Sequence, residues 1–223
     1  MKYLNKKALL STPILLFVAL ANPAVAGPLD WLFGNRVPFQ PTSQGFPSTV
    51  GGAVRGNSCD DTSNILALNP QDSNHEVMGK NKNLVLPIQQ KGLSGKNALV
   101  TISNDQYYAE TEITLPDTEV ALLNTNLSLP EGDYRWRVNV ACGEDFTIND
   151  PIVMGNVAVT NADSDNDIEK NVVNGKWYDS LSTAVASHTN QSSDLLPALL
   201  TFVSPESRVN QASITILDLD IKI

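Results

Sequence analysis

The sequence is poor in the residues that build most metal sites and nucleophilic active sites. Its 223 residues include two cysteines, two histidines and three methionines, and aromatic residues make up only 6%. It contains no Cys-x-x-Cys pair, and His75 and His188 stand far apart in the chain. A zinc site or a thiol–imidazole pair is therefore not expected. A Gly-x-Ser-x-Gly motif is also missing. We therefore expect no cofactor and no enzyme activity.

Positive charge is also scarce. Fifteen lysines and arginines stand against 24 aspartates and glutamates, which gives a formal net charge of −9 and a pI near 4.6. A chain this acidic repels phosphate backbones, so nucleic acid is not an expected partner. The same repulsion disfavours anionic lipid surfaces, which bind basic stretches.

Only one apolar run stands out, and it lies at the N-terminus. Lys2, Lys6 and Lys7 precede an uncharged stretch at 8–21, and Ala-Val-Ala follows at 24–26. This order is typical of a secretory signal peptide, predicted at 1–26 with cleavage after Ala26. The stretch of about 14 residues is shorter than the roughly 20 that span a bilayer. We therefore expect an exported protein, periplasmic or extracellular, with no membrane span and a formal charge of −12 after cleavage.

The two cysteines both lie in the predicted mature part. In an oxidising compartment a lone pair of cysteines most often forms a disulfide, so we predict a Cys59–Cys142 bridge. Closing a loop of this length would remove about 4 to 5 kcal/mol of unfolded-state entropy. A reactive thiol or a metal site is the alternative.

Most of the mature chain has the pattern of short strands separated by turns. Residues 27–50 are rich in proline, glycine and aromatics and predict a linker, which docks on the domain or binds a partner. Strands are expected at 65–68, 84–89, 98–103, 110–115, 120–123, 134–142 and 152–160. In the clearest of them, Tyr134, Trp136 and Val138 alternate with Arg135 and Arg137, which places the arginines on the face away from the core.

This pattern predicts an α+β fold that is mainly β. We expect an immunoglobulin-like antiparallel sandwich at 51–160, followed by a short C-terminal helical segment at 161–208. Within that segment apolar residues at helical spacing predict one helix from Trp177 to His188 and a second at 194–203. Residues 209–223 alternate and form either a closing strand or a tail.

Two small clusters in the helical segment are candidate sites. Asp163, Asp165 and Asp167 place carboxylates at alternate positions, as calcium loops do, but the glycine and glutamate of such a loop are missing. A solvated acidic turn before a helix is the alternative to a calcium site. The second cluster is Trp177, Tyr178 and Asp179, which would form either an aromatic platform for a sugar or peptide, or an anchor between helix and sheet.

Several motifs in a fixed order carry a family resemblance. They are Gly-Gly-Ala-Val-Arg at 51–55 before Cys59, Ala-Leu-Asn-Pro at 67–70, Leu-Pro-Glu-Gly-Asp-Tyr-Arg-Trp-Arg at 129–137 before Cys142, and Trp-Tyr-Asp at 177–179. From about Gly51 to Arg208 the chain resembles the bacterial domain of unknown function 928 family. The resemblance implies an exported protein with a β domain and a helical tail, and it implies no established activity.

Composition, motifs and resemblance lead to one functional expectation with two alternatives. We expect an exported, non-enzymatic binding or interaction module of the cell envelope, whose partner is an extracytoplasmic protein or glycan. A hydrolase that cleaves envelope glycans with two carboxylates is one alternative. A structural subunit of a surface assembly, joined through the linker or the C-terminal strand, is the other.

Overall fold

The computed structural model describes residues 59–60, 63–70, 77–80, 82–188, 196–197, 199–200 and 214–221. The predicted signal peptide at 1–26, the linker at 27–50 and most of the helix predicted at 194–203 lie outside these residues. So does His75. Residues 196–197 and 199–200 of that last segment are helical.

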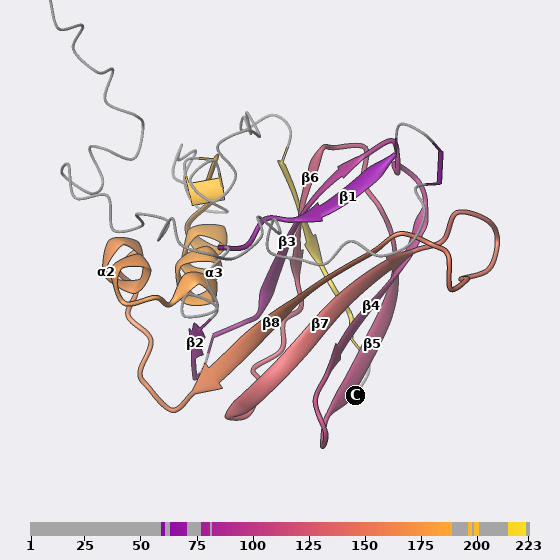
Figure 1. Cartoon of the computed structure of the whole chain (residues 1–223). Helices are drawn as coiled ribbons and strands as arrows, with labels where there is room; N and C mark the ends of the chain where they lie inside the picture. Colours follow the sequence, from indigo (N-terminus) through magenta and orange to yellow (C-terminus); the bar gives the residue numbers. More distant parts are fainter. Residues whose placement is uncertain are drawn as a thin grey trace, which may run out of the picture.

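The described part of the chain is mainly β, with two sheets and two short helices (Figure 1). Its elements, in chain order, are β1 Asn64–Ala67, β2 Val77–Gly79, β3 Val85–Lys91, β4 Asn97–Ser103, β5 Tyr108–Thr114, β6 Val120–Asn124, β7 Gly132–Val140, β8 Ile152–Thr160, α2 Ile168–Val173, α3 Trp177–His188 and β9 Ile214–Asp218. All seven predicted strands are present, with ends that differ by at most two residues.

The strands form a four-stranded sheet in the order β1-β3-β6-β9 and a five-stranded sheet in the order β2-β8-β7-β4-β5. The prediction that all pairs are antiparallel is wrong for two of them, because β2 pairs parallel with β8 and β9 pairs parallel with β6. Strand β2 was not predicted, since three residues are too few to show alternation. The helical segment is therefore an insertion between β8 and β9, and the C-terminal stretch returns to complete the four-stranded sheet.

Both sheets contribute to one hydrophobic core. In β7 the inward set of Tyr134, Trp136, Val138 and Val140 is buried, while Arg135 and the other outward residues are exposed or half-buried, as the alternation predicts. The indole of Trp136 packs on the backbone of β8, the neighbouring strand of the same sheet. A Cβ atom at Gly155, its partner in β8, would lie 2.6 Å from two ring atoms, so only glycine fits there.

The two ends of the domain are fixed by longer-range contacts. Cys59 and Cys142 form a disulfide across 83 positions of sequence, with their Cα atoms 5.0 Å apart. Both cysteines are half-buried, so the bridge lies beside the core rather than within it. Next to β9, the Thr111 hydroxyl of β5 donates a hydrogen bond of 3.0 Å to the carbonyl oxygen of Asp220. This contact ties the edge of one sheet to the edge of the other.

Helix α3 packs against α2 and against strands β2 and β3 (Figure 1). The predicted apolar stripe of Trp177, Leu181, Ala184 and Val185 is buried. Within the residues that the structure describes, no helix combines the length and the apolar character needed to cross a bilayer.

Candidate interaction surface

The structure buries the predicted aromatic platform. Trp177, Tyr178 and Asp179 are all fully buried between α3 and the sheets. The Tyr178 hydroxyl accepts hydrogen bonds from Trp136 Nε1 at 2.8 Å and Asn69 Nδ2 at 3.0 Å, and it donates one to the Asn156 carbonyl at 3.0 Å. These side chains join the helix to the five-stranded sheet and to the segment after β1, and they do not form an exposed surface for a sugar or peptide.

Asp179 connects α3 to β2. Its carboxylate accepts a hydrogen bond of 2.9 Å from the backbone N–H of Gly79. Burial has the largest effect on this group and raises its pKa, while the bonds from Gly79 and Ser164 and the charges of two nearby lysines act in the opposite direction. A Cβ atom at Gly79 would lie 3.0 Å from the carboxylate, so glycine permits this close approach.

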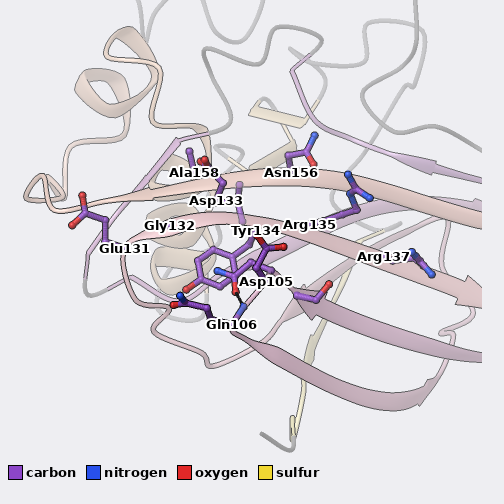
Figure 2. A pocket seen from close by; sticks show the side chains of 13 residues that line it. Asp105, Gln106, Glu131, Gly132, Asp133, Tyr134, Arg135, Arg137, Asn156 and Ala158 are labelled. Atoms are coloured by element: carbon purple, nitrogen blue, oxygen red, sulfur yellow. Dashed lines mark hydrogen bonds between the residues drawn. The ribbon is translucent and has the colours of Figure 1, made fainter.

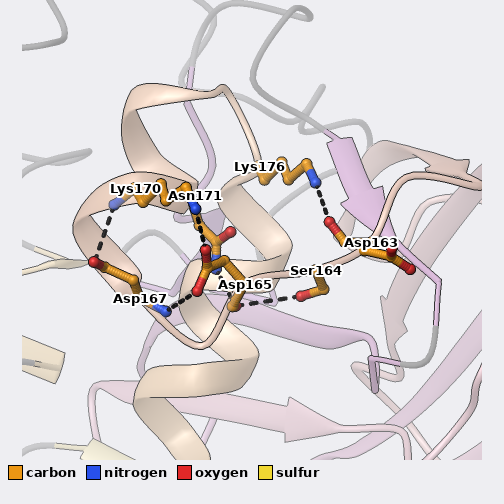
Figure 3. A network of polar contacts seen from close by, with 7 residues as sticks. All are labelled: Asp163, Ser164, Asp165, Asp167, Lys170, Asn171 and Lys176. Atoms are coloured by element: carbon orange, nitrogen blue, oxygen red, sulfur yellow. Dashed lines mark hydrogen bonds and ion pairs between the residues drawn. The ribbon is translucent and has the colours of Figure 1, made fainter.

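Each of the three candidate calcium ligands is bonded to other groups of the protein, and Asp165 and Asp167 both bond to Lys170 (Figure 3). Asp163 forms an ion pair of 3.3 Å with Lys80, and Asp165 pairs with Lys170. Asp167 caps α2 by accepting a hydrogen bond of 3.1 Å from the Lys170 backbone N–H. Within the described ranges, no group of three or more histidine, cysteine, aspartate or glutamate side chains is arranged to hold a metal ion. The three aspartates therefore lie in an acidic turn that leads into α2, with Asp167 as its N-cap.

The outer faces of the two sheets differ. In the four-stranded sheet, 85–88 of β3 and 120–123 of β6 are buried at every position, so both faces of these strands are covered. In the five-stranded sheet, β4, β5, β7 and β8 alternate between buried and more exposed residues. We call the outer surface of these four strands the open face.

Strand register arranges the open face into rows that run across β5, β4, β7 and β8. One row is Tyr108, Ser103, Arg135 and Asn156; the next is Glu110, Thr101, Arg137 and Met154; the third is Glu112, Leu99, Asn139 and Ile152. In these rows acidic residues lie on β5, uncharged residues on β4 and both basic residues on β7, where the exposed Asp133 lies two positions before Arg135 on the same face.

The two arginines of β7 are the only arginines in the part of the chain that the structure describes. Both are exposed, and among the described residues neither makes an ion pair or a hydrogen bond. Side chains two positions apart on a strand lie about 6.6 Å apart, so Arg135 and Arg137 form one compact basic patch. The patch is positively charged, although the chain as a whole has a formal net charge of −9.

At the acidic edge of the open face, a tyrosine side chain bonds to one of the glutamates of β5. The hydroxyl of Tyr108, whose residue is 58% exposed, donates a hydrogen bond to the Glu110 carboxylate. That bond is the main reason that the pKa of Tyr108 is raised, and the Arg137 guanidinium acts in the lowering direction. Glu110 and Arg137 lie in the same row, separated by Thr101 of β4.

A hollow of about 860 Å³ lies at one end of the open face. It is lined mainly by the β4–β5 turn, β7 and β8. Figure 2 shows Glu131 at one end of the hollow and Arg137 at the other, with Asp105 and Asp133 between them. Its lining is polar, and its basic end coincides with the arginine patch.

The family model described as Domain of Unknown Function (DUF928) matches residues 50–204, more than two thirds of the chain. The chain belongs to the DUF928 family. The resemblance carried by the motifs is thereby confirmed. A search of the curated proteins finds no match.

The match includes all four strands of the open face of this DUF928 domain, and it ends before β9. Several matched motifs have structural roles here. The Ala-Leu-Asn-Pro motif supplies Asn69 to the buried tyrosine, and the Trp-Tyr-Asp motif supplies that tyrosine and Asp179.

Sequence reasoning placed Arg135 and Arg137 correctly on the outer side of a strand but assigned them no role. It did not identify Glu110 or Tyr108 as their neighbours on the same surface. Alternation reveals which residues of one strand share a face, but it does not reveal which strands are adjacent or in which register. The arrangement of exposed charge across three strands is a tertiary property of the DUF928 domain.

Proposed function

We propose that this DUF928 domain is an exported, non-enzymatic interaction module that binds an acidic partner through the open face. The observation that carries the proposal is the arginine patch, because two exposed guanidinium groups lie side by side on the open face and bond to none of the residues that the structure describes. Guanidinium groups bind carboxylates with two parallel hydrogen bonds, and such charge-assisted bonds are stronger than neutral ones. The partner therefore presents carboxylate or similar anionic groups.

The scaffold part of the proposal is an immunoglobulin-like sandwich. Support comes from the two sheets around one core and from the entry to β7. There the Tyr134 hydroxyl donates a hydrogen bond of 3.0 Å to the Pro130 carbonyl, four residues upstream. A tyrosine that bonds back to the backbone at the start of a strand is the corner typical of immunoglobulin-like domains.

Export is proposed from the leader pattern at 1–26 together with the disulfide. Bridges of this kind persist in oxidising compartments and are rare in reducing ones. The proposal that the domain is not an enzyme rests on its scarcity of catalytic side chains. The sequence has two histidines, and both cysteine thiols are used in one disulfide.

The test is site-directed photo-crosslinking in cells that export the protein. A benzoylphenylalanine at Thr101, in the centre of the open face, is expected to give covalent adducts. The same residue at Lys91, which is exposed at the end of β3 in the other sheet, is expected to give none.

Arg137→Ser should reduce the Thr101 adducts about tenfold or more, because a charged hydrogen bond contributes about 1.5 to 3 kcal/mol. Lys91→Ser removes the same charge elsewhere and should leave them unchanged. Adducts that form equally from both positions, or that do not depend on Arg137, would contradict the proposed role of the open face.

A further inference from the structure

The open face is bordered by opposite charges on the two sides of a neutral strand. The outward residues of β4 are Asn97, Leu99, Thr101 and Ser103, none of which is charged. On one side of β4, β5 carries Glu110 and Glu112, and on the other side β7 carries the arginine patch, with Asp133 at the end of the strand before it. Neighbouring strands lie about 4.8 Å apart, so acids and bases flank β4 at equal distances.

We propose that the acidic partner of the open face is a second copy of this chain, bound about a two-fold axis that runs along β4. The inference rests on the proposed function, because it identifies the partner of that same surface. A rotation by 180° about an axis in the plane between two such faces places β5 of one copy over β7 of the other. Positions along the strands are unchanged by this rotation, so each row faces the same row of the partner.

The rows then match in chemistry. Glu110 of each copy faces Arg137 of the other, which forms two equivalent carboxylate–guanidinium pairs. Tyr108 of each copy faces Arg135, which suits stacking of a guanidinium on an exposed aromatic ring. Glu112 faces the uncharged Asn139. A two-fold interface requires this kind of self-complementarity, since the same patch must serve both copies.

A two-fold axis along β4 is favoured over an axis along β5 or β7, because the outward residues of β4 are uncharged. Residues on a two-fold axis meet their own copies, and along β4 these are Leu99, Thr101 and Ser103. If the axis ran along β7 instead, Arg135 would meet Arg135 and Arg137 would meet Arg137. An axis along β5 would bring Glu110 against Glu110. Like charges in direct contact oppose association.

The size of the open face indicates a weak dimer. About this axis only β5, β4 and β7 lie opposite strands of the other copy, because no strand follows β5 to face β8. Three strands at about 4.8 Å spacing and seven residues at about 3.3 Å define a plane of about 14 by 23 Å, or about 330 Å² from each copy and about 660 Å² for both. This total lies below the range of stable complexes and in that of the weakest transient ones. The copies also repel each other through their net negative charge, which about 0.1 M salt screens beyond roughly 10 Å.

The test measures self-association of the oxidised mature chain, residues 27–223, by sedimentation equilibrium at about 0.1 M salt. The native chain is expected to dimerise reversibly. Glu110→Arg and Arg137→Glu should each weaken dimerisation about tenfold or more, because each reversal places like charges opposite one another. The double variant Glu110→Arg/Arg137→Glu should restore it, since the pair is then formed with exchanged signs.

Two control variants carry matched charge reversals away from the open face. Glu144→Arg lies in the exposed β7–β8 loop, and Lys91→Glu lies at the end of β3. Neither should change the dimerisation constant. Circular dichroism of every variant verifies that the fold is retained.

A second measurement tests the axis itself. Thr101→Cys would place a thiol opposite its own copy, and a short bismaleimide should link two chains through it. Thr147→Cys, exposed in the β7–β8 loop, should not be linked at the same protein concentration.

Several outcomes would overturn the inference. One is a protein that stays monomeric at millimolar concentration, and another is a double variant that associates no better than the single ones. If Thr101 then still cross-links to a different envelope protein in an Arg137-dependent way, the proposed function stands and only the identity of the partner is wrong. If those adducts are also missing, both fall.

Discussion

Replacing Tyr178 by phenylalanine would remove one oxygen atom from the interior and leave the ring in place. That oxygen is bonded to Trp136 Nε1, Asn69 Nδ2 and the Asn156 carbonyl at 2.8, 3.0 and 3.0 Å. The two N–H donors lie in the buried part of the domain, where loss of a partner costs about 1 to 3 kcal/mol for each group. We expect partial relaxation and a total loss of about 2 to 4 kcal/mol in the free energy of unfolding.

The loss can be measured by urea unfolding followed through tryptophan fluorescence, and by calorimetry. For a domain of this size a change of 1 kcal/mol shifts the melting temperature by about 2 to 4 °C, so a decrease of about 5 to 15 °C is expected. Tyr107→Phe is the control, because the half-buried Tyr107 packs edge-on against Tyr134 and its hydroxyl makes no hydrogen bond among the described residues. If Tyr178→Phe costs no more than this control, the hydroxyl does not hold the helix to the sheets.

Three other changes test separate parts of the fold. Gly155→Ala should destabilise by about 1 to 3 kcal/mol or more in urea unfolding, because its methyl group would overlap the facing indole; Gly143→Ala has open space and should be neutral. Replacing Cys59 and Cys142 together by serine should cost about 4 to 5 kcal/mol by the same assay, and an unchanged midpoint would contradict the loop-closure argument. Burial raises the pKa of Asp179, so the folded state binds this proton more tightly than the unfolded state does. Below the unfolded pKa of about 3.9 the carboxyl is protonated in both states and costs no stability. As the pH rises from there through the pKa of the folded state, the stability of the fold decreases. Asp179→Asn should remove that part of the pH dependence of the melting temperature, and an identical pH profile would show that the group is not held in this way.

The strands could be predicted because each is a local pattern. Alternation in 134–142 and the turn before it predict which side chains of β7 face the core, and the structure places them there. The disulfide could also be predicted, because the chain offers only one pairing. The shortest strand was missed, and the direction of β9 was not predicted. Both depend on where the chain returns after the helical segment, which no local pattern records.

By itself, the amino-acid sequence of this DUF928 domain determined its strands, its sulfur bridge, its acidic charge and the family to which it belongs. Each of these depends on near neighbours, on counting or on an ordered set of motifs. Only the tertiary structure decided that Tyr178 is an interior anchor and that Glu110, Thr101 and Arg137 share one row. Those facts depend on the register between strands far apart in the chain. Register is set by the packing of the whole core, because a slip of one residue would turn every buried side chain outward.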